Sequence, residues 1–185
     1  NGISSIESST FSGCSSLTNI EIPPSVKSIG ASAFCGCSSL TSIILPNGIL
    51  SIEDEIFSYC SILINIEIPS SVVSIGTNAF CGCSSLKNIE LPSSATSIGE
   101  RAFYDCSSLK SLTLPNGILS IEDETFSGCK NLTSLEIPSS VTSIGYEAFK
   151  NCSSLISITI PSGVTSIDSS TFSNCSKLKK VNGLE

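Results

Sequence analysis

The chain has 185 residues, of which 40% are hydrophobic and 14% charged, and its formal net charge is −7. This length suits one ordinary domain with a sizeable core, and the lack of a basic patch argues against nucleic acid and anionic membrane surfaces as partners. No apolar run approaches the length of a membrane span and no signal peptide opens the chain, so we expect no membrane insertion in this segment.

A single unit of 23 residues repeats through the whole chain. Phenylalanine recurs at this step from Phe11 to Phe172, and proline recurs at it from Pro23 to Pro161. A fixed period of about 20 to 50 residues is typical of a solenoid. The chain begins and ends part-way through a unit, so we expect residues 1–185 to form one repeat domain of a longer protein, with both ends cut within repeats.

Each unit has the pattern L-x-x-I-x-I-P-x-x-V-x-S-I-G-x-x-A-F-x-x-C-x-x, which predicts its elements in order. The alternation in L-x-x-I-x-I predicts a short strand near residues 19–22 and every 23 residues after. The proline that follows ends this strand because it has no N–H to donate. After a turn, V-x-S-I predicts a second extended piece. The A-F-x-x-C run is too short for more than a helical turn.

The packing follows from the repeat. No unit can bury its apolar residues alone, so neighbouring units must cover them. The eight phenylalanines are expected to form an interior spine, with Phe103 buried. The predicted fold class is a β-rich repeat solenoid: a right-handed, curved arc of about eight coils of 23 residues, with short parallel strands and short helical turns.

The repeated pattern and its 23-residue step resemble the BspA-like (Treponema-type) leucine-rich repeats along essentially the whole chain. One position differs from typical leucine-rich repeats, because serine or glycine replaces the usual asparagine or cysteine after the strand. These residues are Ser25, Gly48, Ser71, Ser94, Gly117, Ser140 and Gly163. The resemblance implies a leucine-rich-repeat arc and a cell-surface or secreted protein used in adhesion and protein binding.

Cysteine holds one position of the unit in all eight copies. These laddered cysteines are Cys14, Cys37, Cys60, Cys83, Cys106, Cys129, Cys152 and Cys175. A metal site, a disulfide framework and a ladder of buried thiols are the alternatives, and we predict mainly reduced, buried thiols that act as small hydrophobes. With no histidine and no C-x-x-C, zinc-site spacing is missing, so we predict no metal and no cofactor. Cys35 and Cys81 are extra, and a separation of roughly 10 Å keeps them from bonding each other.

Neither the repeated serines nor the acidic clusters of the chain match a catalytic motif. Serine precedes the second-strand isoleucine in every unit, whereas a nucleophile is needed once, and no histidine is available as a base. The acidic clusters Glu53-Asp54-Glu55 and Glu122-Asp123-Glu124 lack calcium-loop spacing, which favours solvated loops. We therefore predict that the protein is not an enzyme. A carbohydrate-active β-helix enzyme would need inward-turned carboxylates, of which the apolar core pattern gives no sign.

The outward positions of L-x-x-I-x-I are the candidate binding site, because in this family they lie on a concave sheet. The candidate protein-binding residues are Asn19, Glu21, Asn65, Glu67, Lys87, Asn88, Glu90, Lys110, Thr113 and Glu136. Aromatic and arginine anchors, which usually dominate binding energy, are missing from the acidic-polar rows of this face. By resemblance, the predicted function is a protein-binding or adhesion module whose ligand is a host or matrix surface protein. The alternative is a spacer or stalk without a ligand of its own.

Overall fold

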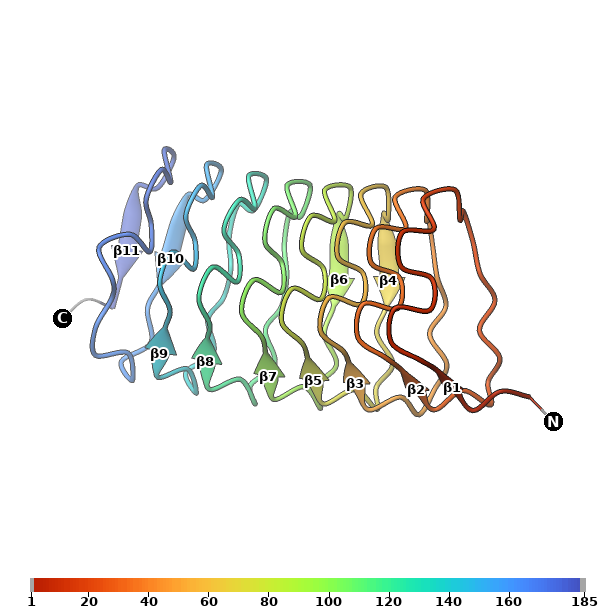
Figure 1. Cartoon of the computed structure of the whole chain (residues 1–185). Helices are drawn as coiled ribbons and strands as arrows, with labels where there is room; N and C mark the ends of the chain where they lie inside the picture. Colours follow the sequence, from red (N-terminus) through yellow and green to blue (C-terminus); the bar gives the residue numbers. More distant parts are fainter. Residues whose placement is uncertain (1, 184–185) are drawn as a thin grey trace.

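The computed structural model describes residues 2–183, which form a stack of coils with one coil for each 23-residue unit (Figure 1). Most coils contribute to two rows of short strands or isolated bridges. The first row follows the L-x-x-I-x-I segments and contains β4 (Asn65–Glu67), β6 (Asn88–Glu90), β10 (Ser157–Thr159) and β11 (Lys180–Asn182). The second row follows V-x-S-I and contains β1 (Ser5–Ile6), β2 (Ser28–Ile29), β3 (Ser51–Ile52), β5 (Ser74–Ile75), β7 (Ser97–Ile98), β8 (Ser120–Ile121) and β9 (Ser143–Ile144).

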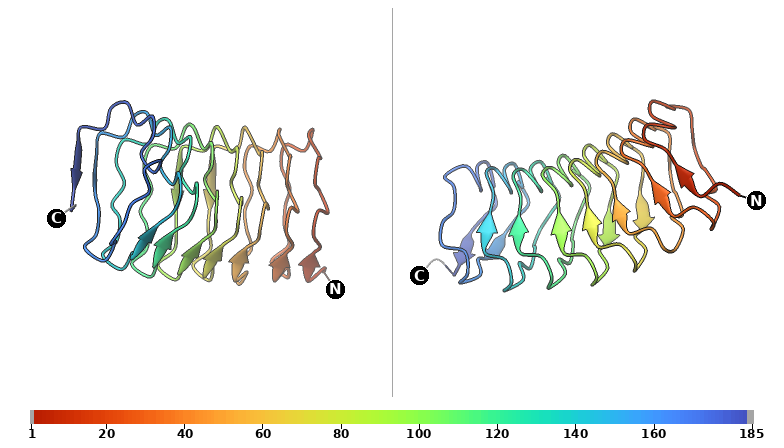
Figure 2. Two further views of the ribbon diagram at one scale, coloured as in Figure 1. Left: turned by 60° about the vertical axis from the view of Figure 1, so that its left-hand side comes forward. Right: turned by 60° about the horizontal axis from the view of Figure 1, so that its bottom comes forward.

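Every pairing between these strands is parallel and joins equivalent residues of adjacent coils. Isolated parallel bridges such as Ile44↔Glu67 and Thr113↔Glu136 continue the first row where no strand is assigned. The predicted parallel solenoid of about eight coils is therefore confirmed, although residues 19–22 form no assigned strand. Figure 2 shows that the stack curves gently from one end to the other.

The phenylalanines form the predicted interior spine. Each ring stacks on the next, with centroids 5.3–5.7 Å apart and planes within 19° of parallel. Phe103 is 0% exposed, which confirms its predicted burial. The rings thus link all eight coils through one continuous apolar column.

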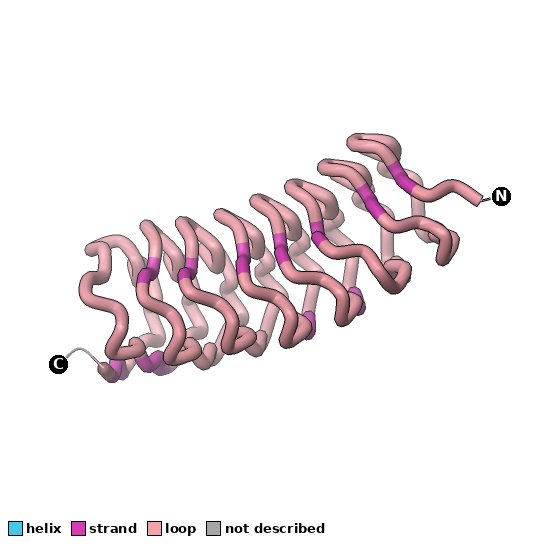
Figure 3. The backbone as a smooth tube through the Cα atoms, turned by 90° about the horizontal axis from the view of Figure 1, so that it is seen from below, coloured by secondary structure: helices cyan, strands magenta, loops and turns pink. Residues whose placement is uncertain are grey.

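The predicted helical turns are wrong, since no helix occurs within residues 2–183, where the backbone consists of strands, turns and loops (Figure 3). Along A-F-x-x-C, successive N–H groups bond alternately to a carbonyl of their own coil and to a carbonyl of the next coil. Cys35 N–H bonds back to Ser32 O at 3.1 Å in its own coil, whereas Phe34 N–H reaches Ile56 O of the next coil at 3.0 Å. Left-handed residues break the run as well, at Ser32 (φ 56°) and Gly36 (φ 72°). Hydrogen bonding between coils therefore replaces the helical ladder.

The laddered cysteines are hydrogen-bond donors as well as small apolar side chains. Cys60 Sγ donates to Phe34 O at 3.2 Å, and the same contact to the phenylalanine carbonyl 26 residues earlier recurs from Cys37 to Cys175. All ten cysteines are free. Six laddered thiols are buried, but Cys14 is exposed and Cys175 half-buried, so the predicted burial is wrong for these two. Both lie in terminal coils of the described stack, where a neighbouring coil covers one side only.

Serine takes over part of the role of the missing asparagine ladder. Ser71 Oγ donates to Ile49 O at 2.6 Å, and Ser140 Oγ donates to Ile118 O at 2.6 Å, each reaching the preceding coil. Where glycine holds this position, its N–H can use the neighbouring serine, as Gly48 does with Ser71 Oγ at 3.2 Å. A short hydroxyl side chain therefore satisfies the carbonyl that would otherwise be unpaired in the turn.

Candidate functional site

The first-strand face is defined here by the outward side chains of the L-x-x-I-x-I segments, the face that the family resemblance implies to be concave. All ten predicted site residues are exposed on it. Their inward neighbours are buried: Ile66 is 6% and Ile89 3% exposed. This alternation follows from the period of two in a strand, which places apolar residues in the core and polar residues in solvent.

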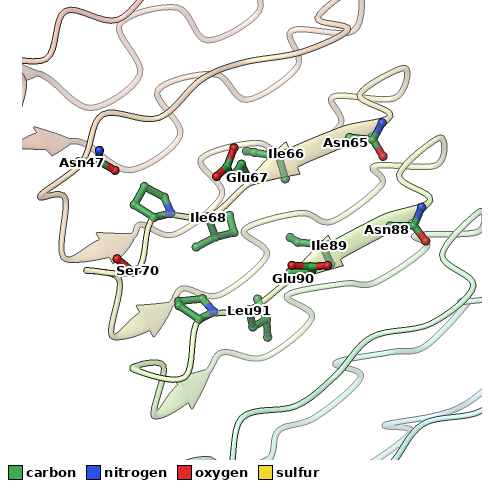
Figure 4. A pocket seen from close by; sticks show the side chains of 12 residues that line it. Asn47, Asn65, Ile66, Glu67, Ile68, Ser70, Asn88, Ile89, Glu90 and Leu91 are labelled. Atoms are coloured by element: carbon green, nitrogen blue, oxygen red, sulfur yellow. The ribbon is translucent and has the colours of Figure 1, made fainter.

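The structure brings four of the predicted residues together on adjacent coils. In the parallel register of β4 and β6, Asn65 lies beside Asn88 and Glu67 beside Glu90. These side chains line a groove of about 570 Å³, with the two amides at one end of the strands and the two carboxylates nearer the prolines (Figure 4). The groove has the size of an ordinary ligand site of roughly 300–1,000 Å³.

The two carboxylates in the groove have the same sign and no counter-ion from the protein. Among residues 2–183, neither Glu67 nor Glu90 takes part in an ion pair. Like charges directly opposite each other on adjacent strands are destabilising. A cationic group on a partner would therefore be attracted to this pair and would relieve its repulsion.

The other predicted residues lie further along the same face. Lys87 and Lys110 are adjacent, since the N–H of Lys110 bonds to the O of Lys87 at 3.3 Å. Thr113 pairs with Glu136 through a parallel bridge, and Glu136 lines a second groove of about 520 Å³. Asn19 and Glu21 are not part of the central cluster, because a complete coil separates them from Asn65 and Glu67.

Sequence reasoning missed the apolar neighbours of the carboxylates. Ile44 is 83% exposed and bridges to Glu67, and the two residues line a smaller groove together with Asn47 and Pro69. Asn47 and Pro69 also line the central groove, so the two hollows adjoin each other. The signal was available in the sequence, because Ile44 is the only apolar residue in a column that otherwise holds polar residues.

The acidic clusters contribute to structure. Asp54 Oδ1 accepts a hydrogen bond from the N–H of Thr77 at 2.7 Å, and Asp123 Oδ1 accepts one from the N–H of Tyr146 at 2.7 Å, each from the next coil. Within residues 2–183, no group of three or more cysteine, aspartate or glutamate side chains is arranged to hold a metal ion. That part of the chain also contains no helix long and apolar enough to cross a membrane.

Burial makes the six buried thiols of the ladder weak acids. Desolvation, with a further contribution from Cys37, raises the pKa of Cys60 from 9.0 to about 12. Desolvation also raises the pKa of Cys83 and Cys106 well above the ordinary value. Because the thiolate is the nucleophile, a thiol kept protonated by burial is unreactive at neutral pH.

The comparisons with known proteins agree with this geometry. The family model of the BspA type leucine rich repeat region matches residues 4–117 and 96–184 of this chain. A leucine-rich repeat protein of T. pallidum is similar, with a TM-score of 0.79 and 39% identity over 83% of this chain and 72% of that one. No curated protein is similar enough in sequence to count as a relative.

Two further solved structures are similar over 97% of this chain. A leucine-rich repeat protein from Bacteroides ovatus gives a TM-score of 0.75 at 32% identity, and this chain covers 58% of its length. A leucine-rich cell surface protein from Faecalibacterium prausnitzii gives a TM-score of 0.51 at 26% identity, with 76% of its length covered. The chain therefore spans little more than half of one of these relatives.

Proposed function

This chain belongs to the BspA-type leucine-rich repeat family, and from that premise we propose that it is a non-enzymatic protein-binding or adhesion module. Repeat solenoids present extended surfaces on which such modules bind their partners. A cell-surface or secreted location is part of the proposal. It is supported by the similarity to the F. prausnitzii protein, which is described as a cell surface protein.

The ligand surface in this proposal is the first-strand face, centred on the groove between β4 and β6. The observation that carries it is the in-register pair of Glu67 and Glu90, exposed and without a cation among residues 2–183. A partner segment with lysine or arginine side chains complements this pair. Asn65 and Asn88 add amide donors and acceptors beside it. The proposed partner is thus an extracellular or matrix protein that presents a basic segment.

The double variant Glu67→Lys plus Glu90→Lys tests this surface. It replaces one exposed like-charge pair with another, so we expect thermal unfolding to remain nearly unchanged while partner binding weakens by a large factor and loses its salt dependence. The measurement is surface plasmon resonance against a panel of purified extracellular matrix and serum proteins at two salt concentrations. A melting curve of each variant verifies the fold.

The matched control is Glu53→Lys plus Glu122→Lys, which makes the same change in net charge outside the first-strand face. This control should bind like the parent. If both double variants bind alike, the groove is not the binding site. If the parent binds nothing on the panel, the spacer alternative gains support.

A further inference from the structure

Several residues that depart from the repeat lie together on the turn face. We define the turn face as the residues two before, one after and two after each phenylalanine. Two of the three tyrosines in the chain, Tyr59 and Tyr104, lie there with its only arginine, Arg101. The two cysteines outside the ladder, Cys35 and Cys81, lie beside them. Several other coils fold with serine, glycine or asparagine at these positions, so the coil itself does not require the larger side chains.

These side chains surround a hollow of about 360 Å³ that spans several coils. Ser58 and Cys81 are buried, Tyr104 is half-buried, and Tyr59 is 61% exposed. The volume falls within the roughly 300–1,000 Å³ of small-ligand sites. The hollow shares no residue with the groove on the first-strand face.

Tyr59 is held in an unusual conformation at this place. Its φ is 60°, in a column where Gly36 and Gly82 supply the left-handed backbone in the adjacent coils. It is the one aromatic residue with positive φ within residues 2–183, and bulky side chains rarely adopt that region. The ring lies over Gly82, where an added Cβ would be 2.7 Å from its Cδ1. Strain of this kind clusters at ligand-binding positions.

The polar groups around the hollow carry both signs of charge. Glu55, Asn78 and Arg101 hold the same position in three successive coils, so a carboxylate, an amide and a guanidinium follow one another along the stack. The guanidinium bonds to Glu124, its Nε lies 4.0 Å from a Glu100 oxygen, and its carbon lies 5.6 Å from the centroid of the Tyr104 ring. These contacts leave some of its five N–H donors available. Glu55 accepts one hydrogen bond from Ser32 Oγ at 3.2 Å.

This combination selects against charged ligands. An anion would meet Glu55 and also the Glu100 and Glu124 carboxylates that pair with Arg101, whereas a cation would meet the Arg101 guanidinium, so neither charge finds an unopposed partner in the hollow. A neutral ligand with several hydroxyl groups fits better, because each hydroxyl both donates and accepts hydrogen bonds. Its apolar C–H face would pack on the exposed ring of Tyr59.

We propose that this hollow is a binding site for a short neutral saccharide. Tyr59 is the stacking surface, and Glu55, Asn78 and Arg101 bond the hydroxyl groups. Tyr104 forms the wall that packs against Arg101. The site is separate from the first-strand face, so it gives the protein a second binding activity that does not depend on the protein partner proposed above.

Tyrosine fluorescence provides a direct test, since the chain has three tyrosines and no tryptophan. The probes are N-acetylglucosamine, methyl β-galactoside, lactose and maltose, each titrated into the full chain with ligand-observed NMR as an independent readout. We expect a saturable change with at least one of them. Tyr59→Gly and Tyr104→Ser restore residues found in the same columns of other coils, so each should keep the fold and weaken binding on the order of tenfold or more.

Two control variants distinguish binding in this hollow from binding at Tyr146 or on the first-strand face. Tyr146→Thr changes the third tyrosine, which lies outside the hollow, to the residue found at Thr77 in the same column, and it should bind like the parent. Glu67→Lys plus Glu90→Lys should also leave saccharide binding unchanged.

Three outcomes overturn the proposal. The first is that no saccharide of the panel changes the fluorescence or the NMR signal. The second is that binding persists unaltered in the Tyr59→Gly plus Tyr104→Ser variant. The third is a protein partner that loses affinity in this variant while no saccharide binds, which would assign the hollow to protein recognition.

Discussion

Residues at equivalent positions of the repeat contribute differently to the free energy of unfolding, and two phenylalanines of the spine allow this difference to be measured. Phe103 is fully buried between Phe80 and Phe126, whereas Phe11 is half-buried and stacks on Phe34 alone. We expect Phe103→Ala to lower the free energy of unfolding by about 3–5 kcal/mol through the cavity it opens. Phe11→Ala should cost clearly less. Urea denaturation of both variants gives the comparison, and equal losses would contradict a spine that depends on neighbours on both sides.

The laddered thiols predict a specific dependence of stability on pH. The pKa of Cys60 is raised by burial from 9.0 to about 12, so the folded state keeps a proton that the unfolded chain loses above pH 9. Its contribution is therefore complete below about pH 9 and is lost as the pH rises toward 12. In that window, stability should fall by roughly 1.4 kcal/mol per pH unit for each such thiol.

Urea unfolding between pH 8 and pH 11 tests this effect, with Cys60→Ala as the matched variant. The variant removes one titrating thiol, so its loss of stability with pH should be less steep than that of the parent. Identical pH slopes would show that Cys60 ionises equally in both states.

The sequence predicted what the repeat requires of every residue and missed what depends on contacts between coils. The burial of Phe103 was predicted correctly because the 23-residue period stacks equivalent residues of all coils in one column, and an apolar column must face the core. The donation from Cys60 Sγ to Phe34 O was not predicted, since a cysteine and a carbonyl 26 residues apart show no pattern that separates a donor from a small hydrophobe.

At the scale of the element, the strands could be predicted and the turns could not. Alternation in L-x-x-I-x-I identifies β4 and β6 directly, because a strand uses a period of two. The A-F-x-x-C run contains residues that suit a helix, but left-handed residues such as Ser32 (φ 56°) and bonds to the next coil keep it from forming one. The sequence of a single unit does not reveal these bonds, because their acceptors are carbonyl groups of the neighbouring coil.

The turn after each proline gives an element-scale prediction. Ser94 Oγ lies 2.6 Å from Val72 O in the preceding coil, while the adjacent Ser93 is exposed and makes no side-chain hydrogen bond within the described residues. We expect Ser94→Ala to cost about 1 kcal/mol of unfolding free energy and Ser93→Ala almost nothing. Chemical denaturation of the two variants measures the difference, and a null result for Ser94→Ala would remove the proposed substitute for the asparagine ladder.

The candidate site could be predicted only in part at this scale. The exposed rows of the first-strand face follow from alternation, so Glu67 and Glu90 were found. The hollow around Tyr59 and Arg101 was not, because its residues come from different columns of successive coils, and their proximity depends on the path of the turns.

For the whole molecule, the coils are linked to their neighbours only, so stability should vary along the stack. Buried area is shared between adjacent coils, and a terminal coil has one neighbour where a central coil has two. Local opening should therefore be easiest at the ends and hardest in the middle. The laddered cysteines report this opening, because one thiol occupies the same position in each of the eight coils and a buried thiol can react only when its coil opens.

We expect alkylation of the native protein to follow the position of the coil. Cys14 is exposed and should react first, followed by the half-buried Cys175, then by Cys37 and Cys152, with Cys106 in the centre slowest. Iodoacetamide labelling over time, with each site followed by peptide mass spectrometry, gives the order. Labelling after denaturation gives the total, and ten reactive thiols would confirm the reduced state. Equal rates at the six buried cysteines of the ladder would mean that the stack opens only as a whole. The coils would then act as one cooperative unit and not as an array joined neighbour to neighbour.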